Sequence, residues 1–346
     1  MALRIAFYYK KEKVLNINRI SLSEITVLVP FRNEEKNLGL FFASLSKQKV
    51  FPYQILFIDD HSEDDSCQIV EHYKKNNSYV ELLSLTKECG KKAALLKGVE
   101  AATTEYILTM DADVCFHEDY FKSLFNLSKN DLISLPVLME SKSVLGRFFS
   151  VEHTFFNAFN FMLSPLYPIS VSGANMLYRK SALDYSSQLK EHKHLSSGDD
   201  YFLLKALRKK KARIEINNNF NSTVITAAPE SFNAYFQQRL RWLSKTKFKM
   251  NFGEALLGFY IAVYFLGGFI TLISCLFFLD LKLFFFILLL RYMMDSFIFI
   301  TYAQAFNRVK DLLFLPIFQL TYPVLMFGVY ILSFFRKPKW KGRPIQ

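Results

Sequence analysis

The sequence predicts an α/β domain, with a sheet flanked by helices, followed by a C-terminal membrane region. In the N-terminal part, apolar segments of strand length alternate with helical segments over short connections, which is typical of a parallel sheet. In the C-terminal part, three apolar runs are each long enough to span a membrane, for which about 20 helical residues suffice. We therefore expect a water-exposed domain joined to membrane helices.

Composition and charge support this division. The chain has 346 residues, of which 51% are hydrophobic, and its 37 phenylalanines are densest in the C-terminal part. The net charge is +12, but lysine and arginine lie beside the apolar runs and in scattered pairs, so a membrane surface is the expected partner and nucleic acid is not. The four cysteines have neither C-x-x-C nor zinc-site spacing, which indicates reduced thiols facing a cytosol.

Four buried strands are expected in the N-terminal part. Their apolar runs cover Ile25–Pro30, Tyr53–Ile58, Val80–Leu85 and Tyr106–Met110, the last followed directly by Asp111. A helix follows each of the first three strands: one after Asn33, one over about 64–75, and one rich in Ala and Leu that ends near Gly98. Three of the four strand ends carry polar or charged side chains, and the carboxyl edge of such a sheet is where ligands bind.

The segment that follows mixes the two kinds of element. We expect strands over 131–136, 174–178, 213–216 and 222–226, and helices over 147–163, from Asp199 to about Arg208, and from Phe232 to about Phe248. The last of these helices leads directly into the membrane region.

The apolar runs of the membrane region cover Ala255–Leu279, Leu281–Ala303 and Leu312–Phe335. Arg291 and Asp295 lie four residues apart on the middle run and so share one helical face. Because charged groups are costly in lipid, they predict an ion pair that faces protein.

The side of the membrane on which the chain ends stays open from the sequence. Basic residues flank both the entry to the membrane region (Arg239, Arg241, Lys245, Lys247, Lys249) and the tail after it (Arg336, Lys337, Lys339, Lys341, Arg343). The positive-inside rule places both groups on the cytosolic side, whereas three full spans would separate them. Either one run lies in the interface or is re-entrant, or the rule is broken in this chain.

Asp111 and Asp113 end the fourth strand and form a candidate metal site. One residue apart on an extended chain they would point to opposite faces, but at a strand end the chain can turn so that both reach one cation. Carboxylate oxygens suit Mg²⁺ or Mn²⁺, and nothing in the pattern suits zinc. The alternative is a solvated acidic turn.

Other element ends carry further candidate ligands. Asp59 and Asp60 end the second strand and can accept hydrogen bonds from a ribose or a base, although helix-capping acids look the same. Lys91 follows Gly90 at a helix start, where backbone N–H groups and the ammonium favour a phosphate, unless the lysine is merely solvated.

The adjacent acids Asp199 and Asp200 begin a later helix. One can cap the helix while the other enters a cleft as a general base that takes a proton from an attacking hydroxyl. Capping alone is the alternative.

The helix that starts near Phe232 brings Gln238, Arg241, Trp242 and Lys245 onto one face by their spacing of three and four residues. An amide, a guanidinium and an indole together fit diphosphate recognition and a stacking surface for a sugar or an acceptor. The alternative is an amphipathic helix that lies on the membrane, and both can hold at once.

The order of these motifs is more specific than any one of them. Along the chain they are Pro30-Phe-Arg32-Asn-Glu34, Ile58-Asp59-Asp60-His61-Ser-Glu-Asp64, Gly90-Lys91 with Ala94-Leu95 and Gly98, Asp111-Ala-Asp113, Gly173-Ala-Asn175, Asp199-Asp200 and Gln238-x-x-Arg241-Trp242. Over about residues 24–250 this set resembles the family 2 glycosyltransferases, inverting enzymes of the GT-A fold, a Rossmann-like mixed sheet flanked by helices. Relatives with the last motif include cellulose, chitin and hyaluronan synthases and ceramide glucosyltransferases. The closing Trp340-Lys-Gly-Arg343 resembles membrane-bound bacterial lipid glycosyltransferases.

The resemblance implies a role for each motif. The residues implied to hold uridine are Asp60 and Asp59, with the loop residues Pro30, Arg32 and Glu34. The diphosphate would lie near Lys91 and Asp111, and Asp113 would hold the metal. Asp200 would be the base, and Arg241 and Trp242, with Gln238, would close over the diphosphate and the acceptor. Two positions depart from the family. Asp199 stands where many members have Glu, which is a mild change, and His61 replaces a common Gly, which alters the nucleotide fit or simply fills space.

The sequence therefore predicts a metal-dependent hexosyltransferase that moves a sugar from a nucleotide sugar, with UDP favoured, to a hydroxyl of a membrane lipid at the cytosolic face of a bacterial inner membrane. Its expected parts are an N-terminal segment (1–23), a GT-A catalytic domain (24–228), an interfacial amphipathic helix (229–252), two to three membrane helices (253–335) and a basic tail (336–346). The alternative enzyme is the catalytic subunit of a processive polysaccharide synthase acting on a glycan acceptor. A nonenzymatic membrane scaffold is the alternative outside enzymes, and the intact acids argue against it.

Overall fold

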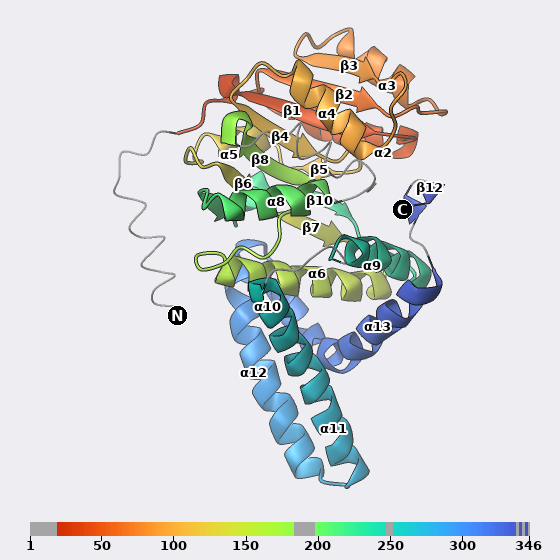
Figure 1. Ribbon diagram of the computed structural model, residues 1–346, viewed down its shortest axis with the longest axis vertical. Helices are drawn as coiled ribbons and strands as arrows, with labels where there is room; N and C mark the ends of the chain where they lie inside the picture. Colours follow the sequence, from red (N-terminus) through yellow and green to blue (C-terminus); the bar gives the residue numbers. More distant parts are fainter. Residues whose placement is uncertain (1–18, 183–197, 247–251, 337–338, 341–342, 345–346) are drawn as a thin grey trace. The chain divides into compact units, whose positions relative to one another are not determined.

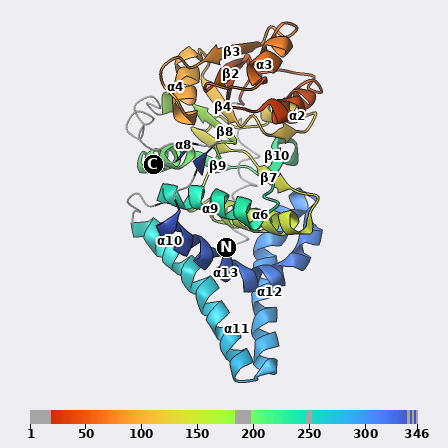
Figure 2. The same cartoon turned by 90° about the vertical axis from the view of Figure 1, so that its right-hand side faces the viewer.

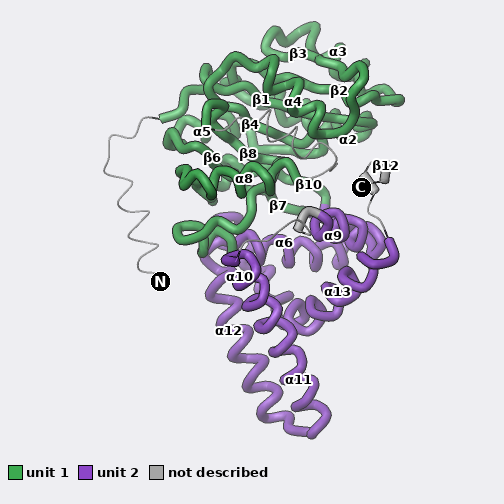
Figure 3. The backbone as a smooth tube through the Cα atoms, in the orientation of Figure 1, with its two compact units in different colours: residues 1–139, 160–227, 346 green, residues 140–159, 228–345 purple. Residues whose placement is uncertain are grey.

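The computed structural model describes residues 19–182, 198–246, 252–336, 339–340 and 343–344 (Figure 1). The chain divides into two compact units. Unit 1 consists of residues 1–139, 160–227 and 346, and unit 2 consists of residues 140–159 and 228–345 (Figure 3). Both units are therefore discontinuous in the sequence.

Unit 1 contains a seven-stranded sheet of order β3-β2-β1-β4-β8-β6-β9. Its strands are β1 Ile25–Phe31, β2 Gln54–Asp59, β3 Val80–Ser84, β4 Tyr106–Met110, β6 Leu132–Ser134, β8 Asn175–Arg179 and β9 Ile214–Ile216. The helices are α2 Glu35–Leu45, α3 Ser66–Lys74, α4 Lys91–Ala101, α5 Tyr120–Leu124 and α8 Asp199–Lys209. Strands β1 to β4 run parallel and β8 runs antiparallel to both neighbours, which confirms the predicted mixed α/β sheet.

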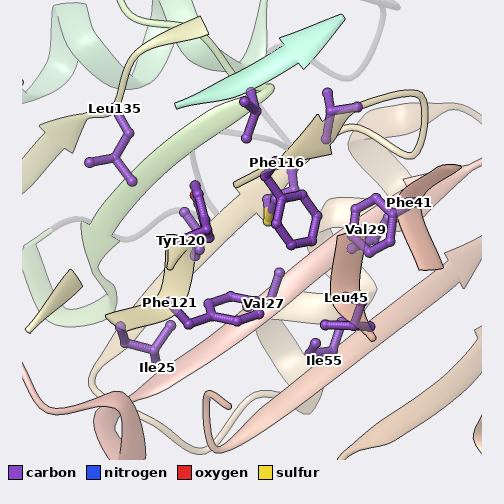
Figure 4. Close-up of a cluster of buried hydrophobic side chains, with 14 of the residues drawn as sticks. Ile25, Val27, Val29, Phe41, Leu45, Ile55, Phe116, Tyr120, Phe121 and Leu135 are labelled. Carbon is purple, nitrogen blue, oxygen red and sulfur yellow. The ribbon is translucent and has the colours of Figure 1, made fainter. Parts of the chain in front are cut away.

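The central strands are buried on both faces, because apolar side chains occupy successive positions and not alternate ones. Val27 and Val29 of β1 join an apolar cluster with α2, α3 and α5, whereas Leu28 points to the other face and joins a cluster with α4 and α8. Figure 4 shows the first cluster, in which Phe41 of α2 and Phe121 of α5 lie over the sheet. The helices thus cover both faces.

A second sheet of unit 1, of order β5-β10-β7, is not predicted by the sequence. It consists of β5 Cys115–Phe116, β7 Val137–Glu140 and β10 Val224–Ala227. The single strand expected over 131–136 is wrong in extent: β6 ends at Ser134, and β7 begins only after Pro136. Proline cannot donate to a strand ladder, so the chain changes sheets there, and the Pro136 carbonyl accepts from Val224 N at 3.0 Å.

Unit 2 is mainly helical. Its elements are α6 Val144–Leu163, which belongs to it up to residue 159, α9 Phe232–Thr246, α10 Phe252–Ala262, the π-helical turn η4 Val263–Gly267, α11 Gly268–Phe277, α12 Leu281–Ala305, the 3₁₀ segment η5 Val309–Phe314, α13 Leu315–Phe335, β11 Lys339–Trp340 and β12 Arg343–Pro344. Three helical stretches are long and apolar enough to cross a membrane: Phe252–Phe277, Leu281–Ala305 and Val309–Phe335. They coincide with the predicted apolar runs.

The polar pair of α12 faces protein as predicted, but the direct ion pair is wrong. Asp295 is fully buried, and its carboxylate accepts from the Tyr264 hydroxyl at 2.7 Å and from the Gln319 amide at 2.6 Å. Arg291 instead donates to the main-chain oxygen of Tyr264 at 2.8 Å. A Cβ at Gly268 would overlap the Arg291 guanidinium, so the glycine leaves room for this arginine beside α11.

Candidate active site

Three parallel strands deliver polar residues to one edge of the sheet. Phe31 of β1 lies opposite Asp59 of β2, and β4 pairs with β1 on its other side. The residues that follow these strands, Arg32, Asp60 and Asp111, therefore begin at the same carboxyl edge. That edge is where open α/β sheets bind their ligands.

Arg32 joins the loops after β1 and β2. Its Nη1 donates to the main-chain oxygen of Asp60 at 3.1 Å, and its Nη2 donates to the Glu63 carboxylate at 3.1 Å. Arg32 is buried, and Asp60 is only 1% exposed. Pro30 lies within β1, opposite Ile58. Arg32 thus connects the loop after β1 to the loop after β2. Direct contact of Pro30, Arg32 or Asp60 with a nucleotide stays a prediction.

Two other predicted nucleotide ligands make local hydrogen bonds. Asp59 Oδ1 accepts from Ser62 N at 2.9 Å, and Glu34 Oε2 accepts from Asn37 Nδ2 at 2.6 Å. Both acids are buried and form local hydrogen bonds, and Asp59 does not cap α3, whose N-cap residue is Asp65. Burial, together with the charge of Asp59, raises the pKa of the Cys67 thiol to about 12, and all four cysteines are free thiols.

The loop after β2 has the backbone shape that explains the usual glycine at position 61. His61 has a φ of 57°, in the left-handed region that favours glycine. Its Nδ1 lies 3.3 Å from Asp60 Oδ1. The histidine therefore adopts the backbone conformation usual for glycine, and it places an imidazole ring beside Asp60, the residue predicted to bind uridine.

Lys91, the first residue of α4, forms an ion pair with Asp111 after β4. Its Nζ lies 2.6 Å from Asp111 Oδ1. Burial by itself would lower the pKa of this lysine, but the charge of Asp111, followed by those of Asp199 and Asp200, raises the pKa above its ordinary value. The lysine therefore stays protonated and offers a positive charge to an anionic ligand.

Gly173 marks the point where these segments meet. A Cβ at Gly173 would lie 2.9 Å from Asp199 Oδ2 and 3.6 Å from Lys91 Nζ, and the Cβ of Asp200 would be 3.8 Å away. Asp199 is 6% exposed, and its Oδ2 has no hydrogen-bond partner among the described residues. Asp200 is only partly buried, and its Oδ1 accepts from Tyr201 N at 2.8 Å. Of the two acids, Asp200 is the more accessible to an acceptor.

Replacing Gly173 by alanine should therefore disturb the site. The new methyl group would force the Asp199 carboxylate to move, and a shift of about 1 Å among catalytic groups can lower a rate by about 10²-fold. We expect Gly173→Ala to lower the turnover number of sugar transfer by about 10-fold or more. The matched control is Gly39→Ala in α2, where a Cβ meets nothing within 4 Å, and it should keep full activity. Equal activity of the two variants would contradict the crowding at Gly173.

The residues after β4 fit a divalent cation by their donor chemistry. Asp113 is exposed, whereas Asp111 is partly buried and already paired with Lys91. Among the described residues, no group of three or more His, Cys, Asp and Glu side chains could hold a metal ion. Mg²⁺ and Mn²⁺ often use one or two carboxylates and complete their coordination with water and substrate phosphates. Asp113 fits that arrangement, and the ion pair with Lys91 occupies one oxygen of Asp111.

In unit 2, α9 carries the residues of the Gln-x-x-Arg-Trp motif. Trp242 is 37% exposed, and Arg241 is partly buried. Gln238 Oε1 accepts from Arg239 Nη1 at 2.8 Å. The side chain of Lys245 lies outside the described residues. Arg239, at the first unspecified position of the motif, thus fixes the side chain of Gln238.

Arg239 forms a buried ion pair that the sequence analysis misses. Its Nε lies 2.9 Å from Oε1 of Glu152 on α6, and the two side chains are 4% and 5% exposed. The other oxygen of Glu152 accepts from the Tyr235 hydroxyl at 2.7 Å. The guanidinium carbon also lies 4.3 Å from the ring centroid of Trp242. A lone glutamate inside the Phe-rich run over 147–163 is the sequence signal that could have indicated such a pair.

His153 lies next to this pair. Its ring centroid is 6.1 Å from that of Trp242. Burial, followed by the charges of Arg239 and Arg308, lowers the pKa of His153 to about 3. The imidazole is therefore neutral at physiological pH, so it adds no positive charge to those of Arg239 and Arg308 nearby.

Comparison with known proteins agrees with the motif order. Residues 26–186 match the model of glycosyl transferase family 2. The chain is similar to the poly-beta-1,6-N-acetyl-D-glucosamine synthase of Staphylococcus epidermidis, with 27% identity over 192 residues, 52% of this chain and 46% of that protein. It is similar to the enzyme of the same name from Staphylococcus aureus, with 26% identity over 160 residues, 43% of this chain and 39% of that protein. The chain spans less than half the length of these relatives.

A solved structure shares the fold. A mannosyltransferase from Pyrobaculum calidifontis in complex with GDP-Man and Mn²⁺ superimposes with a TM-score of 0.53 at 12% identity, over 96% of this chain and 94% of that one. The family match, the mixed sheet flanked by helices and the three candidate membrane helices agree with the predicted architecture. Residues 26–186 therefore match glycosyl transferase family 2, and the chain has a GT-A-like fold.

Proposed function

We propose that the chain is a metal-dependent inverting glycosyltransferase that moves a sugar from a nucleoside diphosphate sugar, with UDP favoured, to a hydroxyl of a membrane lipid. The observation that carries the proposal is the convergence of Lys91, Asp199 and Asp200 around Gly173. It brings a permanent positive charge for a leaving diphosphate close to a carboxylate that can act as a base.

In the proposed reaction, Asp200 takes the proton of the acceptor hydroxyl as the hydroxyl oxygen attacks the anomeric carbon. The bond from that carbon to the diphosphate oxygen breaks on the opposite face, so the anomeric configuration inverts. Lys91 stabilises the negative charge that develops on the diphosphate. When bound at Asp113, Mg²⁺ or Mn²⁺ supplies further neutralisation of the phosphate charge.

The proposed donor site predicts ligand binding that requires a metal. In a thermal-shift screen of the purified chain, a nucleotide sugar with Mn²⁺ should raise the unfolding temperature, since a ligand that binds only the folded state stabilises it. EDTA should abolish the shift, and Asp113→Asn should weaken it. Asp119→Asn, at a partly buried acid paired with the exposed Lys122, is the control and should leave the shift unchanged. An equal shift in EDTA would refute the metal site.

A lipid acceptor and a cytosolic catalytic unit at a bacterial inner membrane complete the proposal. The three candidate membrane helices support a membrane-bound acceptor, and they are few for a channel that conducts a polysaccharide. The second candidate is a processive synthase, which the similarity to poly-beta-1,6-N-acetyl-D-glucosamine synthases favours. Labelled product from the purified chain separates the two: a lipid carrying a single sugar supports the first, and a long polymer supports the second.

A further inference from the structure

We propose that α13 does not cross the membrane: it dips into the membrane from the side of α9 and returns to that side. The proposal concerns topology and holds whatever the donor and acceptor are. By length alone the 27-residue stretch Val309–Phe335 could span the membrane. Its contacts within unit 2, followed from one end to the other, show a different path.

The N-terminal end of this stretch is tied to α6. Asp311 of η5 is 2% exposed, and its carboxylate lies 3.0 Å from Nη2 of Arg147 on α6. Arg308, just before η5, donates to the Ser150 hydroxyl on α6 at 2.7 Å. The start of α13 therefore lies at the level of α6.

The middle of α13 reaches into the candidate spans. Phe318 still packs on Phe155 of α6, with ring centroids 5.1 Å apart, and Gln319 donates to Asp295 of α12 at 2.6 Å. At a rise of 1.5 Å per residue, Asp295 lies about 15 Å along α12 from its end at Ala305, which is about half the thickness of the hydrocarbon core. A proline at position 323 follows within the helix, where it removes a backbone hydrogen bond and permits a bend.

The C-terminal half of α13 returns to α6 and α9. Val329 is fully buried in a cluster with Phe149 of α6 and Tyr235 and Leu240 of α9. A Cβ at Gly328 would lie 3.4 Å from the Phe236 ring of α9. Beyond α13, β11 also contacts α9. Both ends of the stretch therefore lie against α6, and its C-terminal half also lies against α9.

Helices α6 and α9 lie on one side of the membrane. They carry charged residues, including Arg147, Glu152, Arg239 and Arg241, that are costly to place in lipid. The chain also enters α6 directly from β7 and enters α9 directly from β10, so no candidate membrane span separates either helix from the strand before it. Figures 1 and 2 show the hairpin of α11 and α12 extending away from α6 and α9, whereas α13 runs beside them.

We expect lipid to contact the exposed apolar side chains of the stretch Val309–Phe335. Large apolar side chains exposed along this stretch are Leu313, Ile317, Val324, Phe327, Ile331 and Phe334. With two spans, α10–α11 and α12, the basic tail lies on the same side as the basic residues of α9. The topology then satisfies the positive-inside rule, which three spans would break.

Labelling of single cysteines tests this topology. In a chain whose four cysteines are replaced by serine, one cysteine is introduced as Asn233→Cys in α9, Phe278→Cys after α11, or Gln346→Cys at the C-terminus. Right-side-out and inside-out membrane vesicles are treated with an impermeant maleimide. We expect positions 233 and 346 to react from one side and position 278 from the other. Reaction of positions 346 and 278 from the same side would overturn the proposal.

A second measurement covers the case in which the cysteine-free chain fails to insert. The otherwise unaltered chain receives a C-terminal epitope tag, and inside-out vesicles are treated with protease. Loss of the tag together with the catalytic unit supports the proposal. Protection of the tag while the catalytic unit is digested contradicts it.

Discussion

Asp200→Asn should lower the turnover number of sugar transfer by about 10²–10⁴-fold, the range typical of a lost general base. The amide cannot take the acceptor proton, but it keeps the size of the carboxylate and can still accept from Tyr201 N. Binding of the donor should change little, so the thermal shift with a nucleotide sugar should persist. The measurement is the initial rate of sugar transfer at saturating donor.

Asp119→Asn is the matched control for this loss, since it makes the same chemical change at the start of α5, in an acid whose described ion pair is the surface contact with Lys122. It should retain the wild-type rate. If Asp200→Asn is as active as this control, Asp200 is not the base. The buried neighbour Asp199 would then be the next residue to replace.

Arg239→Ala should be the most destabilising of the substitutions considered. It leaves Glu152 buried without its cation, and breaking a buried ion pair costs about 3–5 kcal/mol. It also removes the group that stacks on Trp242 and donates to Gln238, so sugar transfer should fall as well. The measurement is thermal unfolding of the purified chain in detergent, which should show a markedly lower midpoint.

Lys122→Ala is the matched control for this destabilisation. It removes an exposed ion pair whose N–O distance is 3.8 Å, and such pairs contribute about 0–1 kcal/mol. The double variant Arg239→Met with Glu152→Leu should regain much of the lost stability, because no uncompensated charge stays buried. If Arg239→Ala unfolds at the same temperature as Lys122→Ala, the buried pair does not stabilise unit 2.

Much of the fold could be predicted because local signals agree with the tertiary structure. The continuous apolar runs of β1, β2 and β4 can be buried only in a covered parallel sheet, and each is followed by polar residues. The ends of these strands then had to meet at one edge of the sheet, which is where Asp60 and Asp111 follow β2 and β4. The ordered motifs identified the family, which the match over residues 26–186 supports.

Other features depend on contacts between distant segments. The sequence does not show that the chain changes sheets at Pro136, since β7 pairs with a strand formed by residues almost 90 positions later. The partner of Arg239 is a glutamate on another helix, and the partners of Asp295 lie on η4 and α13. Spacing within one helix suggested Arg291 for Asp295, because only near neighbours are visible in a pattern.

The structure also narrows the role of the acids after β4. The residue pattern alone treats Asp111 and Asp113 as one possible metal pair, and the family resemblance already implies Asp113 as the metal ligand with Asp111 near the diphosphate. In the structure, Asp111 Oδ1 lies 2.6 Å from Lys91 Nζ, which agrees with that division. We therefore assign the proposed cation to Asp113 first. Asp111 would then keep the lysine directed toward the diphosphate, so that a single strand end serves two purposes.

The most direct test of the central claim is turnover by the full chain in lipid nanodiscs supplied with Mn²⁺ and a panel of nucleotide sugars. We expect release of nucleoside diphosphate, appearance of the sugar on an extracted lipid with inverted anomeric configuration, and loss of both in Asp200→Asn. A product with retained configuration, or no turnover and no binding of any nucleotide sugar, would contradict that claim.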